Sequence, residues 1–100
     1  MDLGTVIKNI RKKKALTQTQ LAELCGITQT YLSQIENNQK EPNTATLKII
    51  AEKLDFPLPI LFFLSIEDTD IPEKKRDAYN MISPSVKSLI DTFFSDDKDN

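Results

Sequence analysis

One glycine separates two short helical patterns in the stretch TQTQLAELCGITQTYLSQIENNQKEPN, residues 17–43. The first pattern opens at Thr17, where Gln20 completes a capping box, and its buried face is expected to hold Leu21, Leu24 and Cys25. It ends at Gly26, because glycine adopts the left-handed conformation after a helix without steric penalty. Thr28 can cap the second pattern only two residues later. So short a glycine turn is typical of two helices that meet at a steep angle. We therefore expect the second helix to project from the body of the protein.

The projecting helix presents uncharged polar side chains on the face opposite Leu32 and Ile35, which at about 100° per residue mark its buried direction. The members of this face are Gln29, Thr30, Ser33 and Asn37, with Gln34 at its edge. Glutamine can pair bidentately with adenine, and threonine can contact thymine through its hydroxyl or its methyl group. Solubility alone would favour Glu–Lys pairs, which support an exposed helix. The pattern favours recognition of base edges over the alternative, a merely solvated surface.

Glu36 falls on the other side of the same helix, near Leu32, and is expected to turn toward the core. A lone buried carboxylate would be strongly destabilising, so it needs a cationic partner. Arg11 follows the apolar stripe of residues 3–10 and is the candidate. We predict a partly buried ion pair between Arg11 and Glu36.

The rest of the chain also has apolar residues at helical spacing. It has only two glycines and no period-two alternation, which argues against strands. Further helices are expected over residues 3–14, 44–54 and 60–64. Two more, over residues 72–82 and from Pro84 onward with Ser83 as cap, would form a helical hairpin. The predicted fold class is all-α: a five-helix domain over residues 1–66, a C-terminal helical hairpin over 67–95, and a disordered acidic tail over 96–100.

Composition excludes several classes of protein. There is no histidine, and Cys25 is the only cysteine, so imidazole chemistry, paired-cysteine metal sites and an internal disulfide are all missing. We predict no enzyme activity, no cofactor and no metal, and a reducing, cytoplasmic location. The apolar run at residues 56–66 has about half of the ~20 residues needed to cross a bilayer. No membrane partner and no small-molecule effector are evident.

Charge is distributed unevenly along the chain. Residues 1–43 carry six Lys and Arg against four Asp and Glu, whereas residues 44–100 carry seven against eleven. A locally basic half can meet phosphate although the net charge of the chain is −2. At the end of the first predicted helix, the run Arg11 to Lys14 can complement the helix dipole or place a lysine on phosphate.

Several features in order carry a family resemblance: LTQTQLAE, Gly26 in the turn, YLSQIEN, Pro42 in the following loop, and LKIIAEKL. Together they resemble the helix-turn-helix of the Cro and phage-repressor family of DNA-binding regulators, over residues 6–64. The resemblance implies a five-helix fold whose third helix enters the major groove of double-stranded DNA. It also implies that Arg11 and Glu36 match the family's partly buried ion pair.

The resemblance further implies roles for individual residues. The base-reading positions are Gln29, Thr30, Ser33 and Gln34. Phosphate contacts are implied for Gln18, Asn37 and Lys40, and the hydroxyl of Tyr31 is a further phosphate candidate while its ring packs on the domain. Asn43 stands where some phage members have a phosphate-binding arginine, and Glu41 adds a negative charge to that loop. We therefore expect weaker binding per monomer and greater dependence on dimerisation.

The short helix at residues 60–64 carries more apolar side chains than one face can bury, and the predicted hairpin supplies a matching apolar surface. We predict a homodimer interface formed by Phe62, Phe63, Val86, Leu89, Ile90 and Phe93. The alternatives are an intramolecular cap on a monomer and an antitoxin-like protein whose hairpin binds a heterologous partner. The expected function is sequence-specific regulation of transcription, with repression as the simplest mechanism, by a homodimer on an inverted repeat.

Overall fold

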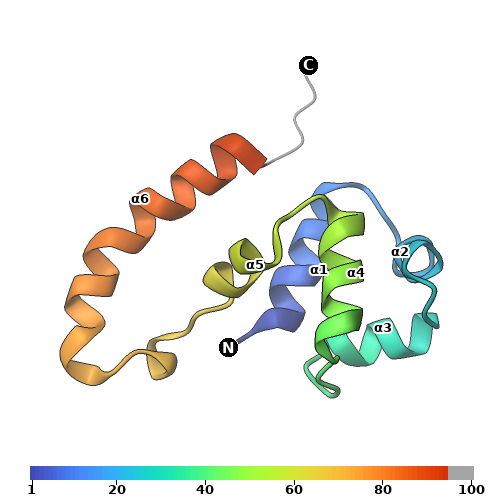
Figure 1. The fold of residues 1–100 in the computed structure, drawn as a ribbon, viewed down its shortest axis with the longest axis horizontal. Helices are drawn as coiled ribbons and strands as arrows, with labels where there is room; N and C mark the ends of the chain where they lie inside the picture. Colours follow the sequence, from blue (N-terminus) through green and yellow to red (C-terminus); the bar gives the residue numbers. More distant parts are fainter. Residues whose placement is uncertain (95–100) are drawn as a thin grey trace.

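The structure, a computed structural model, describes residues 1–94 and contains no strand in that range. The predicted acidic tail, residues 96–100, and the last residue of the predicted C-terminal extension lie outside the described residues. Figure 1 shows the helices in order along the chain. They are α1 (Leu3–Lys13), α2 (Gln18–Cys25), α3 (Gln29–Glu36), α4 (Thr44–Leu54), α5 (Leu58–Leu64) and α6 (Arg76–Phe94), with short 3-10 turns η1 (Asp68–Asp70) and η2 (Glu73–Lys75) before α6. The all-α fold class is confirmed.

Side-chain caps fix the boundaries around α2 and α3. Thr17 Oγ1 accepts from the Gln20 amide at 3.0 Å and Gln20 Oε1 accepts from the Thr17 amide at 2.9 Å, which is the predicted capping box. Gly26 ends α2 with φ 70°, in the left-handed region. Thr28 then caps α3 by accepting from the Tyr31 amide at 3.0 Å. The structure therefore confirms the predicted short turn, with Gly26 ending α2 and Thr28 capping α3.

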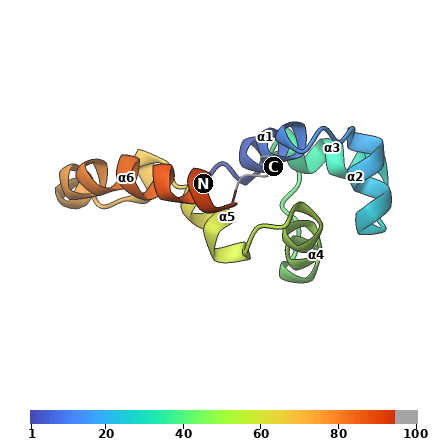
Figure 2. The ribbon, with the colours of Figure 1, turned by 90° about the horizontal axis from the view of Figure 1, so that it is seen from above.

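Helices α1 to α5 enclose one apolar core, and Figure 2 shows α6 lying to one side of this five-helix body. Leu24, expected to share the buried face of α2 with Leu21, is 50% exposed, so that expectation is wrong. The core side chains of the body are Ile7, Ile10, Leu21, Ala22, Cys25, Leu32, Ile35, Leu47, Ile50, Ala51, Leu54, Phe56 and Leu61.

Helix α1 packs closely on the C-terminal end of α3 at Gly4. A Cβ at this position would lie 2.5 Å from the Ile35 carbonyl oxygen and 2.6 Å from that of Glu36. The Gly4 amide donates to Asn38 Oδ1 at 3.1 Å, and Asn38 Nδ2 donates to Asp2 Oδ1 at 2.6 Å. Because Asn38 lies only two residues past the end of α3, these contacts fix how α3 lies on α1.

The predicted C-terminal hairpin is wrong, because residues 76–94 form the single helix α6 with Pro84 in its interior. Proline at the first helical turn was the expected arrangement, yet proline inside a helix removes only one backbone hydrogen bond when its ring is tolerated. Pro84 is exposed and Ser83 beside it is buried. The unpaired carbonyl one turn earlier can therefore be solvated while the opposite face stays packed.

Two aromatic contacts hold α6 beside the body. Tyr79 lies with its ring centroid 6.2 Å from that of Phe63 in α5, and Phe94 lies 5.9 Å from Phe56. Lys13 Nζ of α1 also lies 3.8 Å from Asp91 Oδ1 of α6. The described part of the chain is accordingly broad and thin, 42 × 36 × 19 Å. None of its helices has the length and apolarity that crossing a bilayer requires.

Candidate nucleic-acid interface

The outer face of α3 brings the four predicted base-reading residues together. Gln29 and Thr30, in its first turn, are exposed, and Ser33 and Gln34, one turn later, are half-buried. Eight residues make α3 about 12 Å long at ~1.5 Å per residue, a length that fits within a DNA major groove about 12 Å wide. The face is polar and uncharged, as its sequence indicates.

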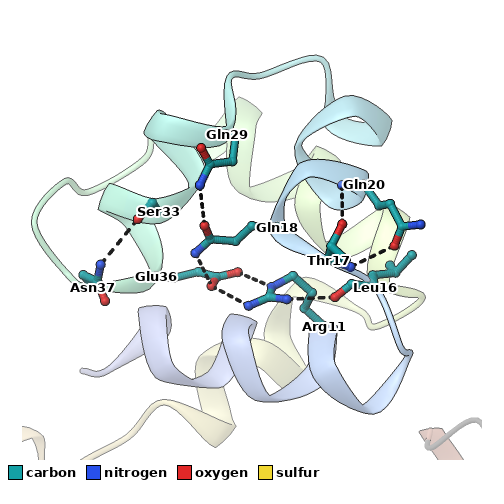
Figure 3. Close-up of polar contacts among 9 residues, drawn as sticks. All are labelled: Arg11, Leu16, Thr17, Gln18, Gln20, Gln29, Ser33, Glu36 and Asn37. Atoms are coloured by element: carbon teal, nitrogen blue, oxygen red, sulfur yellow. Dashed lines mark hydrogen bonds and ion pairs between the residues drawn. The ribbon is translucent and has the colours of Figure 1, made fainter.

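A chain of hydrogen bonds runs from the buried core to this face (Figure 3). Arg11 Nε donates to Glu36 Oε2 at 2.7 Å and Arg11 Nη2 donates to Glu36 Oε1 at 3.0 Å, so the charged pair is bidentate. Gln18 Nε2 donates to the same Oε1 at 3.0 Å. Gln29 Nε2 in turn donates to Gln18 Oε1 at 2.7 Å. Four side chains from three helices thus form one connected network.

The network orients the Gln29 amide. Its contact with Gln18 uses one of the two Nε2 hydrogens, and within residues 1–94 the other hydrogen and Oε1 have no partner. These two groups are the donor and acceptor that bidentate pairing with adenine requires. Because the Gln18 contact already holds the Gln29 amide, less side-chain entropy would be lost when a partner binds to it.

The predicted phosphate contacts differ in their surroundings. Gln18 is half-buried and engaged at both ends of its amide, and Tyr31 is half-buried against the core. Asn37, at the end of α3, is exposed and its Nδ2 lies 3.5 Å from Ser33 Oγ. Lys40 is exposed in the following loop. Asn37 and Lys40 therefore both lie exposed just beyond the C-terminal end of α3.

The lysine run at the end of α1 is directed elsewhere. Lys13 pairs with Asp91 of α6, and Lys14 Nζ lies 5.8 Å from the centre of the Phe56 ring. Arg11 is buried against Glu36. Of the four basic residues, three thus serve contacts within the chain.

The predicted dimer-interface residues divide between surface and interior. Leu89 and Phe93 are 57% and 74% exposed, and Phe62 is exposed at the edge of α5. Phe63 and Val86 are half-buried, whereas Ile90 is buried in the core of the single chain. Met81 and Ile82, exposed on α6, extend the apolar surface beyond the predicted set.

Known proteins share both the sequence pattern and the fold. The profile of the helix-turn-helix family matches residues 7–61. The chain belongs to the helix-turn-helix family. It is 43% identical over 65 residues to the ImmF control region 10 kDa protein of Bacillus phage phi105, covering 65% of this chain and 72% of that protein. It is 36% identical over 80 residues to the Immunity repressor protein of the same phage, covering 80% of this chain but 53% of that protein.

A solved structure extends the likeness of fold past the helix-turn-helix. The clp gene regulator ClgR from Corynebacterium glutamicum superposes with a TM-score of 0.63 at 19% identity, covering 90% of this chain and 87% of that one. The resemblance to Cro and phage repressors is confirmed by the family match and the phage relatives. As a member of the helix-turn-helix family, the protein is a DNA-binding transcriptional regulator and not an enzyme.

Sequence reasoning missed two residues that position the helix-turn-helix. Gly4 permits the close approach of α1 to α3, and Asn38 bridges Gly4 and Asp2 with a backbone φ of 59°. Hydrogen bonds from Asn38 and from the Thr5 amide lower the pKa of Asp2. An isolated glycine in a helical pattern commonly has such a packing reason, and that was the available signal.

Cys25, at the end of the first helix of the helix-turn-helix, is buried and free. Burial raises the pKa of its thiol. The reactive form of cysteine is the thiolate, which a raised pKa disfavours. Cys25 therefore acts as a small apolar core residue.

Proposed function

We propose that the protein is a sequence-specific repressor that inserts α3 into the major groove of an operator. The observation that carries this proposal is the oriented Gln29 amide, which the Arg11–Glu36 pair supports through Gln18. A helix face that is merely solvated would not need its outer amide connected to a buried ion pair. The network instead gives the exposed helix a fixed hydrogen-bonding pattern, and fixed patterns discriminate between bases.

Base reading is assigned to Gln29, Thr30, Ser33 and Gln34, and phosphate contacts to Gln18, Tyr31, Asn37 and Lys40. Gln18 keeps one amide hydrogen that its two known contacts do not use, and this hydrogen can reach a phosphate oxygen. Asn37 and Lys40 are exposed just past the end of α3, where a phosphate beside the groove is within reach. Glu41 and Asn43 in the same loop add no positive charge, so the affinity of one protomer is modest.

We infer a homodimer on an inverted repeat from the outer face of α6. Ile82, Leu89 and Phe93 recur at helical spacing on this face and all three are exposed. A two-fold axis would let the same stripe bury itself against its copy, and closed two-fold dimers are the commonest soluble assemblies. The two recognition helices then lie one DNA turn apart, about 34 Å, with half-sites about 10 base pairs apart or a multiple of that.

Repression rather than activation is supported by the names of relatives. The 36% identical phage protein is called an immunity repressor. A dimer seated on an operator represses in the simplest way, by occluding the polymerase. Because its partner is the genome, we place the protein in the cytoplasm.

The test combines selection of binding sites from random duplexes with measurement of the mass in solution by light scattering. We expect a palindromic consensus with half-sites separated by one helical turn and a mass twice that of the chain. A consensus without symmetry together with a single-chain mass would overturn the dimer. Failure to enrich any sequence would overturn sequence-specific recognition.

A further inference from the structure

A cavity of about 210 Å³ lies between the body and α6. Its apolar lining comes from Ile10 of α1, Phe56, Leu64 of α5 and Ile90 of α6. An apolar cavity of about 150 Å³ is large enough to admit benzene. This one therefore has room for a single ring or a short alkyl chain.

The remaining lining residues are charged. They are Lys13, Lys14, Lys87 and Asp91. Lys13 already lies 3.8 Å from Asp91, whereas within residues 1–94 no ion-pair partner is found for Lys87. An apolar floor beside Lys87, whose positive charge no carboxylate of residues 1–94 neutralises, complements a molecule that is apolar at one end and anionic at the other.

We propose that this cavity binds a small apolar carboxylate, such as an arylalkanoate or a short-chain fatty acid. The ring or chain would cover Ile10, Phe56 and Ile90, and the carboxylate would lie among the lysines. A single negative charge suits the rim better than a phosphate dianion, because Asp91 repels the second charge. The site goes beyond the proposed function, since occupying it requires no DNA.

Its place in the fold gives the site a consequence for α6. The cavity lies beside the Lys13–Asp91 ion pair, and a bound carboxylate competes with Asp91 for Lys13. At the same time the apolar part fills space between α6 and the body. Occupancy therefore changes how firmly α6 is held, and this effect reaches the recognition helices only if the proposed α6 dimer is correct.

The binding test uses the full chain without DNA. Amide signals in ¹H–¹⁵N NMR spectra are followed during titration with sodium phenylacetate and, separately, with phenylacetamide, its uncharged analogue of similar shape. We expect saturable shifts at Lys13, Lys14, Phe56, Lys87 and Asp91, and binding of phenylacetamide about fivefold weaker. Equal affinity for the two compounds, or unsaturable shifts scattered over the surface, would overturn the proposal.

Variants locate the site. Lys87→Gln should weaken phenylacetate binding about two- to fivefold, while Lys74→Gln, a lysine in η2 outside the cavity, should leave it unchanged. Leu64→Phe should fill the cavity and abolish binding, with its spectrum showing whether the fold is retained. Equal effects of the two lysine variants would overturn the assignment.

A second copy of the chain is the competing occupant. It would be revealed by the same cavity signals shifting on dilution without ligand, and that result would also overturn the carboxylate site. The operator selection contains no phenylacetate, so a failed titration leaves the proposed function standing. A failed selection likewise leaves the titration interpretable.

Discussion

Individual side chains connect the stability of this protein to the exposed face of α3. Glu36 is fully buried, and its two oxygens accept three hydrogen bonds from Arg11 and Gln18. Arg11 also donates to the Leu16 carbonyl at 2.8 Å through Nη1. A buried pair satisfied this completely need not add stability, yet losing one partner is strongly destabilising. The pair is therefore a structural requirement on which the orientation of Gln29 depends.

Replacing Glu36 tests this dependence. Glu36→Ala should lower the free energy of unfolding by about 3 to 5 kcal/mol, because it leaves the buried guanidinium without a counter-charge. Thermal or urea unfolding would measure the change. Glu23→Ala, which removes an exposed glutamate of α2, is the matched control and should alter stability by less than about 0.5 kcal/mol. A melting temperature unchanged in both variants would reject the buried-pair account.

Gly4 makes a second prediction about a single residue. Gly4→Ala should destabilise the protein by about 1 to 3 kcal/mol, since the new methyl group meets the carbonyl oxygens at the end of α3. Asn9→Ala, at an exposed position of the same helix, is the control and should change stability by less than about 0.5 kcal/mol. Because alanine favours helices more than glycine does, a stabilised Gly4→Ala would show that α1 does not press on α3 here.

How far the sequence predicts such contacts depends on their origin. The burial of Glu36 could be predicted from its spacing to Leu32 within one helix. The choice of Arg11 as its partner could be predicted because Arg11 comes directly after the apolar stripe of α1. The bond between Gln18 and Gln29 depends on the angle between α2 and α3, which spacing within a helix does not contain. The exposure of Leu24 was missed for the same reason, because the neighbours of α2 decide which of its apolar residues are covered.

The helices themselves were predictable where capping chemistry is strong. Thr17, Gly26, Thr28 and Asn43 end or begin helices as their side chains or backbone freedom dictate. Pro84 misled because proline is commoner at a helix start than inside one. Tertiary packing favours the uninterrupted helix. Tyr79 before Pro84 and Val86 after it both pack on the body, and one continuous helix keeps both contacts.

Tyr79 tests how α6 is held. Its ring packs on Phe63, but its hydroxyl is buried and has no hydrogen-bond partner within residues 1–94. Tyr79→Phe removes an unsatisfied polar group and should raise the free energy of unfolding by about 1 kcal/mol, measured by thermal unfolding. Tyr31→Phe is the control for loss of a hydroxyl in the body. A destabilised Tyr79→Phe would mean that the hydroxyl has a partner in solution.

At the scale of the whole molecule, α1 to α5 form a five-helix body, and α6 lies beside it with an apolar outer face. Helix α6 buries one side against the body and leaves Met81, Ile82, Leu89 and Phe93 exposed. The chain has a net charge of −2, so bulk attraction to DNA is weak. Two linked recognition helices would compensate by doubling the contacts on one operator.

A charge placed on the arm should separate the dimer. Leu89→Glu and Phe93→Glu are expected to give a single-chain mass by light scattering and weaker operator binding, while stability of each chain is retained because both residues are exposed. Asn80→Glu adds the same charge to an exposed polar position of α6 and should preserve the wild-type mass. Unchanged mass in all three variants would place self-association elsewhere.

The base-reading role of α3 is tested by one comparison of affinities. Dissociation constants of the wild type and of Gln29→Ala are measured at one salt concentration on the selected operator and on a random duplex, with Asn80→Ala as control. We predict a loss of about 1 to 3 kcal/mol on the operator alone, with relaxed preference at one base pair and an unchanged melting temperature. An equal loss on both duplexes would contradict recognition of bases by α3.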